Sequence, residues 1–296
     1  MLNVVDKKTI WFTLSGLLVL VSLGLLAASG LKLGLDFKGG SIAEIRFAAP
    51  PPEAAALQKV VEEMQLGAAP VQPTNSGTFV IRTRELSPEQ HQELLKKFSD
   101  SLGELREERY ESIGPTISAE VTRRAFYQLI LVSLAILAYI AWAFRRVPKP
   151  LSSWRFGWAA VIALIHDLLI VMGVFAMLGK TRGVEVDALF VTALLTVLGF
   201  SVHDTIIVFD RIRENLRRLS GQTFANIVSR SINQTIVRSI NTSTTVIFVL
   251  IALLLFGGES TRYFVLALLI GIVVGTYSSI FIASPLLYVF HRKKLN

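Results

Sequence analysis

Cysteine and charge are both scarce in this sequence. The 296 residues include no Cys, which excludes disulfide bonds, thiolate catalysis and cysteine-ligated zinc. Charged residues make up only 18% of the chain, whereas soluble domains have roughly a quarter. Apolar residues reach 52% and are gathered in long runs without charge. Such runs are typical of helices that cross a membrane, so we predict an integral membrane protein of the α-helical class in a lipid bilayer.

Basic residues outnumber acidic ones and give a net charge of +8. Such a charge is compatible with a nucleic-acid partner. The clustered Lys and Arg residues, however, mostly flank the apolar runs, as they do in the cytoplasmic loops of membrane proteins. We therefore expect no nucleic-acid partner.

Six apolar runs predict six membrane-spanning helices. The first, Ile10 to Ala28, has nineteen residues, which is too long for the core of a signal peptide, so we expect a retained helix. The other five cover about 126–144, 156–178, 188–209, 239–257 and 263–290. The predicted parts of the chain are an N-terminal segment with the first helix at 1–30, a separate domain at 31–122, and a five-helix bundle with its loops at 123–296.

The positions of Lys and Arg predict the orientation in the membrane. If the N-terminus is cytoplasmic, six helices place both termini in the cytoplasm and the domain at 31–122 outside it. The two short external loops then hold only Lys180, Arg182 and Arg262, and most other basic residues near the helices are cytoplasmic. Arg123 and Arg124 disagree, but large translocated domains follow the rule weakly. The cytoplasmic stretch 211–238 is long enough for amphipathic helices on the membrane surface.

The domain at 31–122 differs in kind from the rest of the chain because strand and helix patterns alternate in it. A Ser-Pro start at Ser87 and Pro88 is typical of a helix N-terminus. The expected strands are Ser41–Phe47, about 70–73, Thr78–Arg84 and Glu104–Ile113, and the expected helices are 51–65 and 87–103. This β-α-β-β-α-β order predicts a small ferredoxin-like α+β domain.

Glycine motifs mark both ends of this domain. Asp36, Gly39 and Gly40 lie in a run that follows the first helix, where paired glycines allow positive φ and a close backbone approach. A plain polar turn at the membrane exit is the simpler interpretation of this run. Gly114 and Pro115 predict a fixed bend before the second helix.

The last apolar run carries a stripe of small residues in which Gly271 and Gly275 are followed by Ser279 and Ala283, each four residues apart. This spacing favours the close approach of another helix. Pro285 in the same run allows a bend.

Ionisable residues inside the apolar runs are the candidate functional groups, because charge is costly there and marks ion routes or paired interior contacts. His166 and Asp167 lie near the centre of the third run, His203 and Asp204 lie in the fourth, and Arg238 lies where the fifth begins. A buried cluster of these groups suits a proton relay, and a static polar cluster that fixes helix packing is the alternative. The relay is favoured for Asp204, both interpretations stay open for Asp167, and packing is favoured for the histidines.

Several stretches together resemble the SecF family, the smaller membrane subunit of the SecDF protein-export complex in the RND transporter superfamily. They are GLDFKGG at 34–40, IGP at 113–115, VDALFVTALLTVLGFSVHDTIIVFDRIREN at 186–215, NQTIVRSINTSTT at 233–245, FGG at 256–258 and LIGIVVGTYSSIFIASPL at 269–286. The resemblance covers nearly the whole chain, although the domain at 31–122 matches in position and size more than in sequence.

The resemblance implies a non-enzymatic subunit in the bacterial inner membrane that pairs with SecD. It implies that this subunit assists the Sec translocon, SecYEG, with or without further accessory membrane subunits, in the late export of unfolded preproteins. The energy would come from the proton-motive force, and no cofactor is expected. The family's intramembrane aspartate falls on Asp204 and its arginine on Arg238. His203 departs from the family, which usually has Asn before this aspartate.

Two other function classes are weighed. Half of a proton-coupled small-molecule antiporter of the same superfamily would use the same helices, but an external domain of about ninety residues is too small for a substrate cleft. A hydrolase is disfavoured because Gly-x-Gly-Asp, His-Glu-x-x-His and Gly-x-Ser-x-Gly motifs are missing from the sequence. The two His-Asp pairs have side chains of the type that ligates metal, but we expect no metal site.

Overall fold

The computed structural model describes residues 3–48, 51–67, 71–74, 76–148, 151–219 and 221–292. These form two compact units, a helical unit of 1–32 and 126–296 and a sheet unit of 33–125. The boundary between the units at 125/126 falls within one long helix, α5.

Six helices of the described chain are long and apolar enough to cross a membrane. They are α1 (Lys8–Ser29), α5 (Pro115–Ala143), α6 (Ser153–Arg182), α7 (Ala188–Arg218), α8 (Phe224–Phe256) and the last span Glu259–His291. The last span consists of a short 3-10 turn η1 (Glu259–Thr261), α9 (Arg262–Ser278), a π-helical segment η2 (Ser279–Ala283) and α10 (Ser284–Arg292). The prediction of six spanning helices is confirmed at the level of length and composition.

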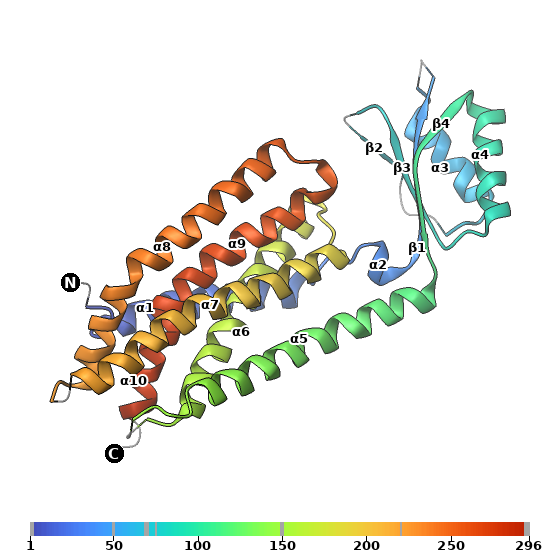
Figure 1. The fold of residues 1–296 in the computed structure, drawn as a ribbon. Coiled ribbons are helices and arrows are strands. Elements are labelled where there is room, and N and C mark those ends of the chain that lie inside the picture. The colour runs from blue at the N-terminus through green and yellow to red at the C-terminus, as the bar shows by residue number, and fades with distance from the viewer. Residues whose placement is uncertain are drawn as a thin grey trace. The chain divides into compact units, whose positions relative to one another are not determined.

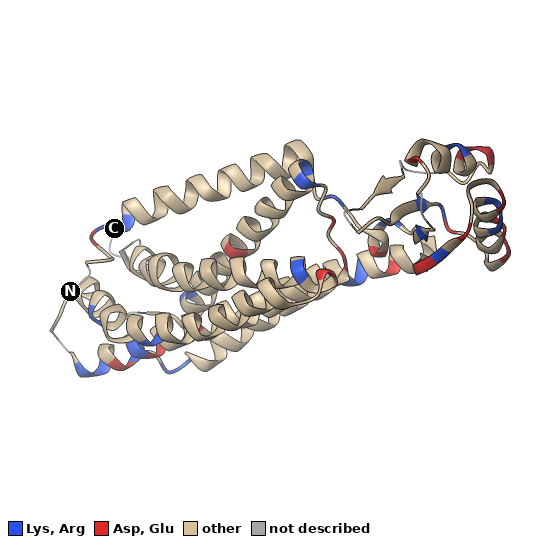
Figure 2. Cartoon of the chain, turned by 90° about the horizontal axis from the view of Figure 1, so that it is seen from above, with Lys and Arg blue, Asp and Glu red and all other residues tan. Residues whose placement is uncertain are grey.

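In the helical unit, α7, α8 and α9 lie side by side, and α6 packs against α1, α7 and α9 (Figure 1). The start of α1 and the end of α10 lie at the same end of this unit (Figure 1), and Lys and Arg residues gather there (Figure 2). Between the helix ends, charged residues are sparse, as the composition of the apolar runs requires.

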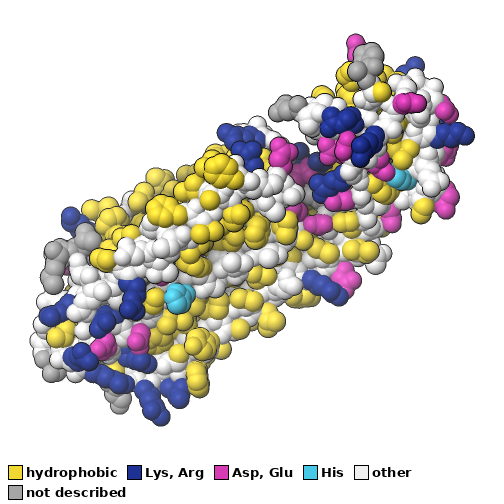
Figure 3. Space-filling view, turned by 45° about the horizontal axis from the view of Figure 1, so that its top comes forward, with side chains coloured by type: hydrophobic (Ala, Val, Ile, Leu, Met, Phe, Trp, Pro, Cys, Tyr) yellow, Lys and Arg dark blue, Asp and Glu magenta, His cyan; other side chains and the backbone are white. Residues whose placement is uncertain are grey.

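Large apolar side chains cover much of the outside of the helices, as one face of the unit shows (Figure 3). Trp142 on α5, for example, is 61% exposed, and Phe256 at the end of α8 is 88% exposed. A water-soluble monomer rarely carries such an extended apolar surface, whereas lipid tails match it. The exposed face is therefore consistent with a bilayer around this unit.

The last span changes its helical type where the sequence allows a bend at Pro285. The ring of Pro285 removes a backbone N–H that an α-helix would use. The π-helical segment η2 ends just before it, and the Ser284 hydroxyl donates to the carbonyl of Ser279, five residues back, at 2.9 Å. The wider π turn thus lies directly before the proline, and such segments frequently occur at functional sites.

Two predicted helix starts are corrected by the structure. α7 continues to Arg218 and α8 begins at Phe224, so the stretch 211–238 belongs to two long helices rather than to surface helices of its own. The Thr223 side chain caps α8 by accepting from the N–H of Asn226 at 3.4 Å, a start signal hidden in a polar stretch. α5 likewise begins at Pro115, about ten residues before its apolar run.

The sheet unit has the order β1 (Gly40–Phe47), α3 (Ala54–Glu63), β2 (Gln72–Pro73), β3 (Phe79–Thr83), α4 (Pro88–Leu102) and β4 (Leu105–Ile113). Its four strands pair antiparallel in the order β2-β3-β1-β4. Its core is formed by apolar side chains of β1, β3, α3 and α4, among them the fully buried Ile45, Leu57 and Phe98. Residue 70, the first of the predicted strand 70–73, lies outside the described residues.

The two glycine motifs lie together in the sheet unit. A short helix, α2 (Leu35–Lys38), carries Asp36 in its first turn and ends at Gly39. Gly40, at φ 116°, then opens β1 opposite Ile113 of β4. An added Cβ on Gly40 would lie 2.6 Å from the carbonyl oxygen of Thr83, so only glycine fits. Gly114 is crowded by the Glu85 carboxylate, and Pro115 begins α5.

Candidate functional site

Asp167 on α6 is a fully buried carboxylate in the middle of the helical unit. Its Oδ2 accepts hydrogen bonds from the hydroxyls of Ser201 on α7 at 2.6 Å and Ser278 on α9 at 2.8 Å. Its Oδ1 lies 2.9 Å from Nδ1 of the adjacent His166. We call these four residues the Asp167 centre. Because its hydrogen bonds join three helices, the centre holds α6, α7 and α9 together.

Asp204 on α7 is also buried, at 1% exposure, but its hydrogen bonds are weaker. The hydroxyls of Ser243 on α8 and Thr276 on α9 both lie 3.4 Å from its Oδ2 and 2.5 Å from each other. In the described chain, Oδ1 of Asp204 makes no hydrogen bond of normal geometry. The buried hydroxyl of Ser239 on α8 is near enough to the carboxyl to interact with it, but it makes no hydrogen bond of normal geometry either. We call Asp204, Ser239, Ser243 and Thr276 the Asp204 centre.

The two centres are connected through the end of α9 and the start of η2. Thr276 bonds to Asp204 and Ser278, two residues on, bonds to Asp167. The next residue, Ser279, donates to the backbone carbonyl of Ser201 at 3.1 Å and pairs with the Thr205 hydroxyl at 2.8 Å. Hydrogen-bond partners of both aspartates therefore lie within four consecutive residues, 276–279, at the end of α9 and the start of η2.

Gly271 and Gly275 lie where α9 approaches α7 most closely. An added Cβ on Gly275 would lie 2.9 Å from Cβ of Ser201, and one on Gly271 would collide with the side chain of Val197. The glycines thus bring the backbone of α9 close enough to α7 for Ser278 and Ser201 to share one carboxylate oxygen. Gly157 similarly lets Leu137 of α5 approach α6.

Arg238 and His203 do not join the buried centres. Both side chains are exposed at the surface of the helical unit, and no ion pair links Arg238 to Asp204 in the described part of the chain. Arg238 instead lines a polar hollow of about 300 Å³ between α7 and α8, together with Asp210 and Glu214. The expected cluster of charges therefore separates into two buried carboxylates and one exposed guanidinium.

The hydroxyl partners of the two carboxylates belong to the candidate site, and sequence reasoning missed them. Ser201, Ser243, Thr276 and Ser278 look like ordinary small residues of membrane helices, where such residues are common. Their only signal in the sequence is helical spacing. Ser201 lies three residues before Asp204, and Ser278 lies three residues after Gly275 of the small-residue stripe.

The arrangement fits a known family. The sequence model described as "Protein export membrane protein SecD/SecF, C-terminal" matches residues 93–293, and that of the "SecD/SecF GG Motif" matches residues 24–51. The chain belongs to the SecD/SecF family. The GG motif covers Gly39 and Gly40, and the larger match covers both buried aspartates.

Relatives named "Protein translocase subunit SecF" align along nearly the full chain. The protein of Thermobaculum terrenum is 45% identical over 99% of this chain and 95% of its own length. That of Anaerolinea thermophila is 40% identical over 98% of this chain and 94% of its own. The resemblance to the SecF family is thus confirmed.

Solved structures of SecDF have the same fold. The crystal structure of SecDF from Thermus thermophilus matches with a TM-score of 0.81 at 35% identity. The match covers 98% of this chain but only 39% of that one. A second SecDF structure, in a super-membrane-facing form, matches with a TM-score of 0.71 at 32% identity. The chain spans about two fifths of the solved SecDF chains.

Proposed function

We propose that this chain is a non-enzymatic subunit of a SecDF-type complex that uses the proton-motive force to assist late export of preproteins through the Sec translocon. The name of its relatives and the likeness to SecDF support the export role. The observation that carries the proton-driven part is the Asp204 centre, a buried carboxyl with one oxygen that makes no hydrogen bond of normal geometry in the described chain. No cofactor is needed, since the proton gradient supplies the energy.

A proton on Asp204 would neutralise a charge that the apolar bundle stabilises poorly, because both hydrogen bonds to Oδ2 are long. Loss of that proton leaves a carboxylate that any approaching cation would stabilise. Arg238 precedes Ser239 on α8, so a modest rotation of α8 would turn the guanidinium toward Asp204. We therefore propose that protonation of Asp204 controls the position of α8 against α7 and α9.

Asp167 has a different part in this proposal. Its carboxylate is bonded by two short hydroxyl contacts and one imidazole, so a change in its charge disturbs three helices at once. Through Thr276 and Ser278, movement at Asp204 would be transmitted to it. His166 and His203 act as secondary groups, His166 by orienting Asp167 and His203 from the surface beside Asp204.

A SecD-like partner would cover the polar surface of α7 and α8. His203, Asp210 and Arg238 are exposed on a unit whose remaining outer surface is largely apolar. Charged side chains facing lipid are costly. The solved SecDF chains contain more than twice the length matched here, which supports a partner half of similar size. SecYEG and the emerging preprotein are the further partners that this function implies.

We propose a multi-pass protein of the bacterial inner membrane with both termini cytoplasmic and the sheet unit, a ferredoxin-like domain, outside the cytoplasm. The gathering of Lys and Arg at the end of the helical unit that holds the start of α1 and the end of α10 supports this orientation. Because the chain has no Cys, one introduced at Ser101 on α4 would be its only thiol. A membrane-impermeant maleimide should label it from the extracytoplasmic side alone.

The test of the function is export of a secreted reporter into membrane vesicles that contain this chain and a SecD partner, with and without a proton gradient. We expect Asp204→Asn to remove the gradient-dependent part of export and to leave the rest. The matched control is Asp100→Asn, the same exchange at an exposed position of α4. Unchanged gradient dependence in Asp204→Asn would show that Asp204 only packs helices.

A further inference from the structure

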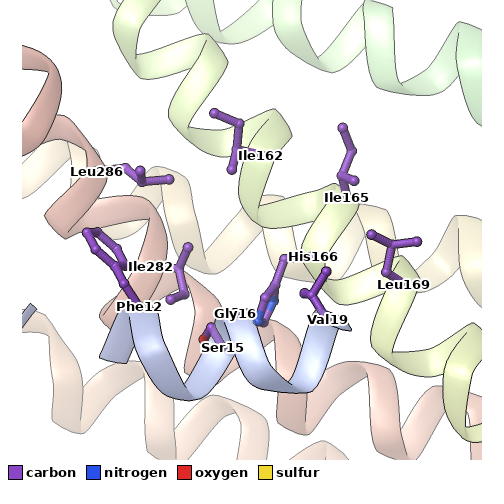
Figure 4. Close-up of a pocket in the computed structure, with 10 residues that line it drawn as sticks. All are labelled: Phe12, Ser15, Gly16, Val19, Ile162, Ile165, His166, Leu169, Ile282 and Leu286. Carbon is purple, nitrogen blue, oxygen red and sulfur yellow. The ribbon is translucent and has the colours of Figure 1, made fainter. Parts of the chain in front are cut away.

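A groove of about 310 Å³ lies on the outer side of the helical unit, away from the Asp204 centre. It is formed by residues of α1 and α6 with Ile282 of η2 and Leu286 of α10 (Figure 4). Ser15 and His166 are the two polar side chains among the described residues that line it. The groove is thus lined by apolar residues apart from these two side chains.

The polar atom that a ligand in this groove could bind is Nε2 of His166. The ring is buried at 6% exposure, and Nε2 has no hydrogen-bond partner in the described chain. An unpaired polar atom at this depth is unfavourable, because it has lost its hydrogen bonds to water and gained none. Figure 4 shows the ring reaching from α6 toward Gly16 and Val19 of α1, which form the opposite wall.

The hydrogen bonds of Asp167 decide what Nε2 can bind. Oδ2 of Asp167 accepts from two hydroxyls, as a carboxylate does, and Oδ1 faces Nδ1 of His166. When Asp167 is ionised, Nδ1 of the neutral ring carries the proton and donates to Oδ1, which leaves Nε2 as an acceptor. The groove thus requires a ligand with a hydrogen-bond donor.

Water fits this groove poorly. A buried water needs two to four polar partners, and the Ser15 hydroxyl is already paired with the hydroxyl of Tyr277 at 3.1 Å. A plain acyl chain matches the apolar walls but leaves Nε2 unpaired. An apolar molecule with one hydroxyl satisfies both.

The groove is also open toward the lipid side. Ile162 and Ile165, on its α6 wall, are 40% and 49% exposed. An added Cβ on Gly16 would meet no atom within 4 Å, so there is open space beside this glycine on the α1 wall of the groove. The hydrocarbon part of a ligand can therefore enter from the bilayer without any movement of the helices. Nε2 of His166 is itself covered, so a small shift of the side chains over it is needed for a hydroxyl to reach it.

We propose that this groove binds a membrane-soluble molecule with a single free hydroxyl, of the class of long-chain alcohols and neutral hydroxylated lipids. The hydroxyl donates to Nε2 of His166, and the hydrocarbon part lies between α1 and α6. Because Nδ1 of the same ring is hydrogen-bonded to Asp167, the imidazole of His166 connects the ligand to the Asp167 centre.

The test uses the full chain in nanodiscs of phosphatidylethanolamine and phosphatidylglycerol, labelled with a diazirine derivative of octanol. Mass spectrometry should locate the label on peptides of α1 and α6 around Gly16 and His166. Octanol should displace the label about five- to tenfold better than octyl methyl ether at equal concentration in the bilayer. That ratio corresponds to one hydrogen bond of about 1 kcal/mol.

Two variants separate the hydrogen bond from the shape of the groove. His166→Leu should remove the preference for the alcohol over the ether. Gly16→Leu should block labelling in the groove while the Asp167 centre stays intact, since the new side chain enters open space and improves helix propensity. If alcohol and ether compete equally in the wild type, ordinary lipid chains fill the groove and the proposal fails. It fails too if α1 and α6 are not labelled, or if Gly16→Leu is labelled like the wild type.

Discussion

Replacing Gly271 with alanine should loosen the packing of α9 on α7. An added Cβ would lie 2.7 Å from Cγ1 of Val197 and closer still to Cγ2, so one of the two helices must move. Val197 is 1% exposed and cannot swing into solvent. The displacement would reach Ser278 seven residues further along α9, whose hydroxyl bonds to Asp167 at 2.8 Å.

The magnitude follows from the type of contact. Overpacking of a tight interior by one methyl group costs about 1–3 kcal/mol. For a chain of this size that corresponds to a fall in Tm of about 2–12 °C. Gly199→Ala on α7 is the matched control, because its new methyl group would meet no atom within 4 Å. We expect the control to be neutral or stabilising by up to about 1 kcal/mol.

The assay is thermal unfolding of the purified full chain in detergent for Gly271→Ala, Val197→Ala and the double variant. Val197→Ala removes the two nearest carbon atoms and leaves only Cβ, 3.0 Å from the added Cβ. The double variant should therefore lose clearly less stability than the sum of the two single substitutions. The interaction energy between the two sites should be about 1 kcal/mol or more. If Gly271→Ala unfolds at the temperature of Gly199→Ala, or if the two substitutions add, then α9 does not approach α7 as described.

Three further outcomes are expected. Ser278→Ala removes one short hydrogen bond from Asp167 and should lower stability by about 1–3 kcal/mol in the same melting assay. Gly40→Ala forces a side chain to φ 116° against a carbonyl oxygen and should destabilise the sheet unit, which amide hydrogen exchange of β1 would report. Ser87→Ala should cost about 1 kcal/mol as a lost cap of α4. The Ser87 hydroxyl also lowers the pKa of Glu89, so the stabilisation from that bond is present above the unfolded pKa and is lost as pH falls through the folded one. An NMR titration should show the Glu89 pKa higher in Ser87→Ala.

The spanning helices were predictable because their signal is local. A run of about twenty apolar residues must form a helix in lipid to satisfy its backbone. The helix ends were less predictable. α7 extends past its apolar run as a charged helix, and α8 begins well before its own run, with the Thr223 cap as the only local signal of its start. The order of strands and helices at 40–113 could be followed for the same local reason, through alternation and the Ser-Pro start of α4.

The candidate site was predictable only in part. The rarity of ionisable residues in apolar runs singled out Asp167, Asp204 and Arg238. Sequence spacing could not say which of them share an interior. The hydroxyl partners of Asp167 lie 34 and 111 positions further along the chain from it, and nothing near them in sequence marks them as ligands of a carboxylate.

The sequence by itself determines which parts of this protein lie in lipid and which in water, because the free energy of transferring a segment from water to lipid depends on that segment's own residues. It also determines, through length and glycine placement, which helices exist and where two of them can approach closely. Only the tertiary structure decides that Asp167 is fully bonded, that Oδ1 of Asp204 makes no hydrogen bond of normal geometry among the described residues, and that Arg238 lies outside both centres. Hydrogen bonds and burial depend on which helix faces meet, and that is a property of the packed bundle rather than of any one segment.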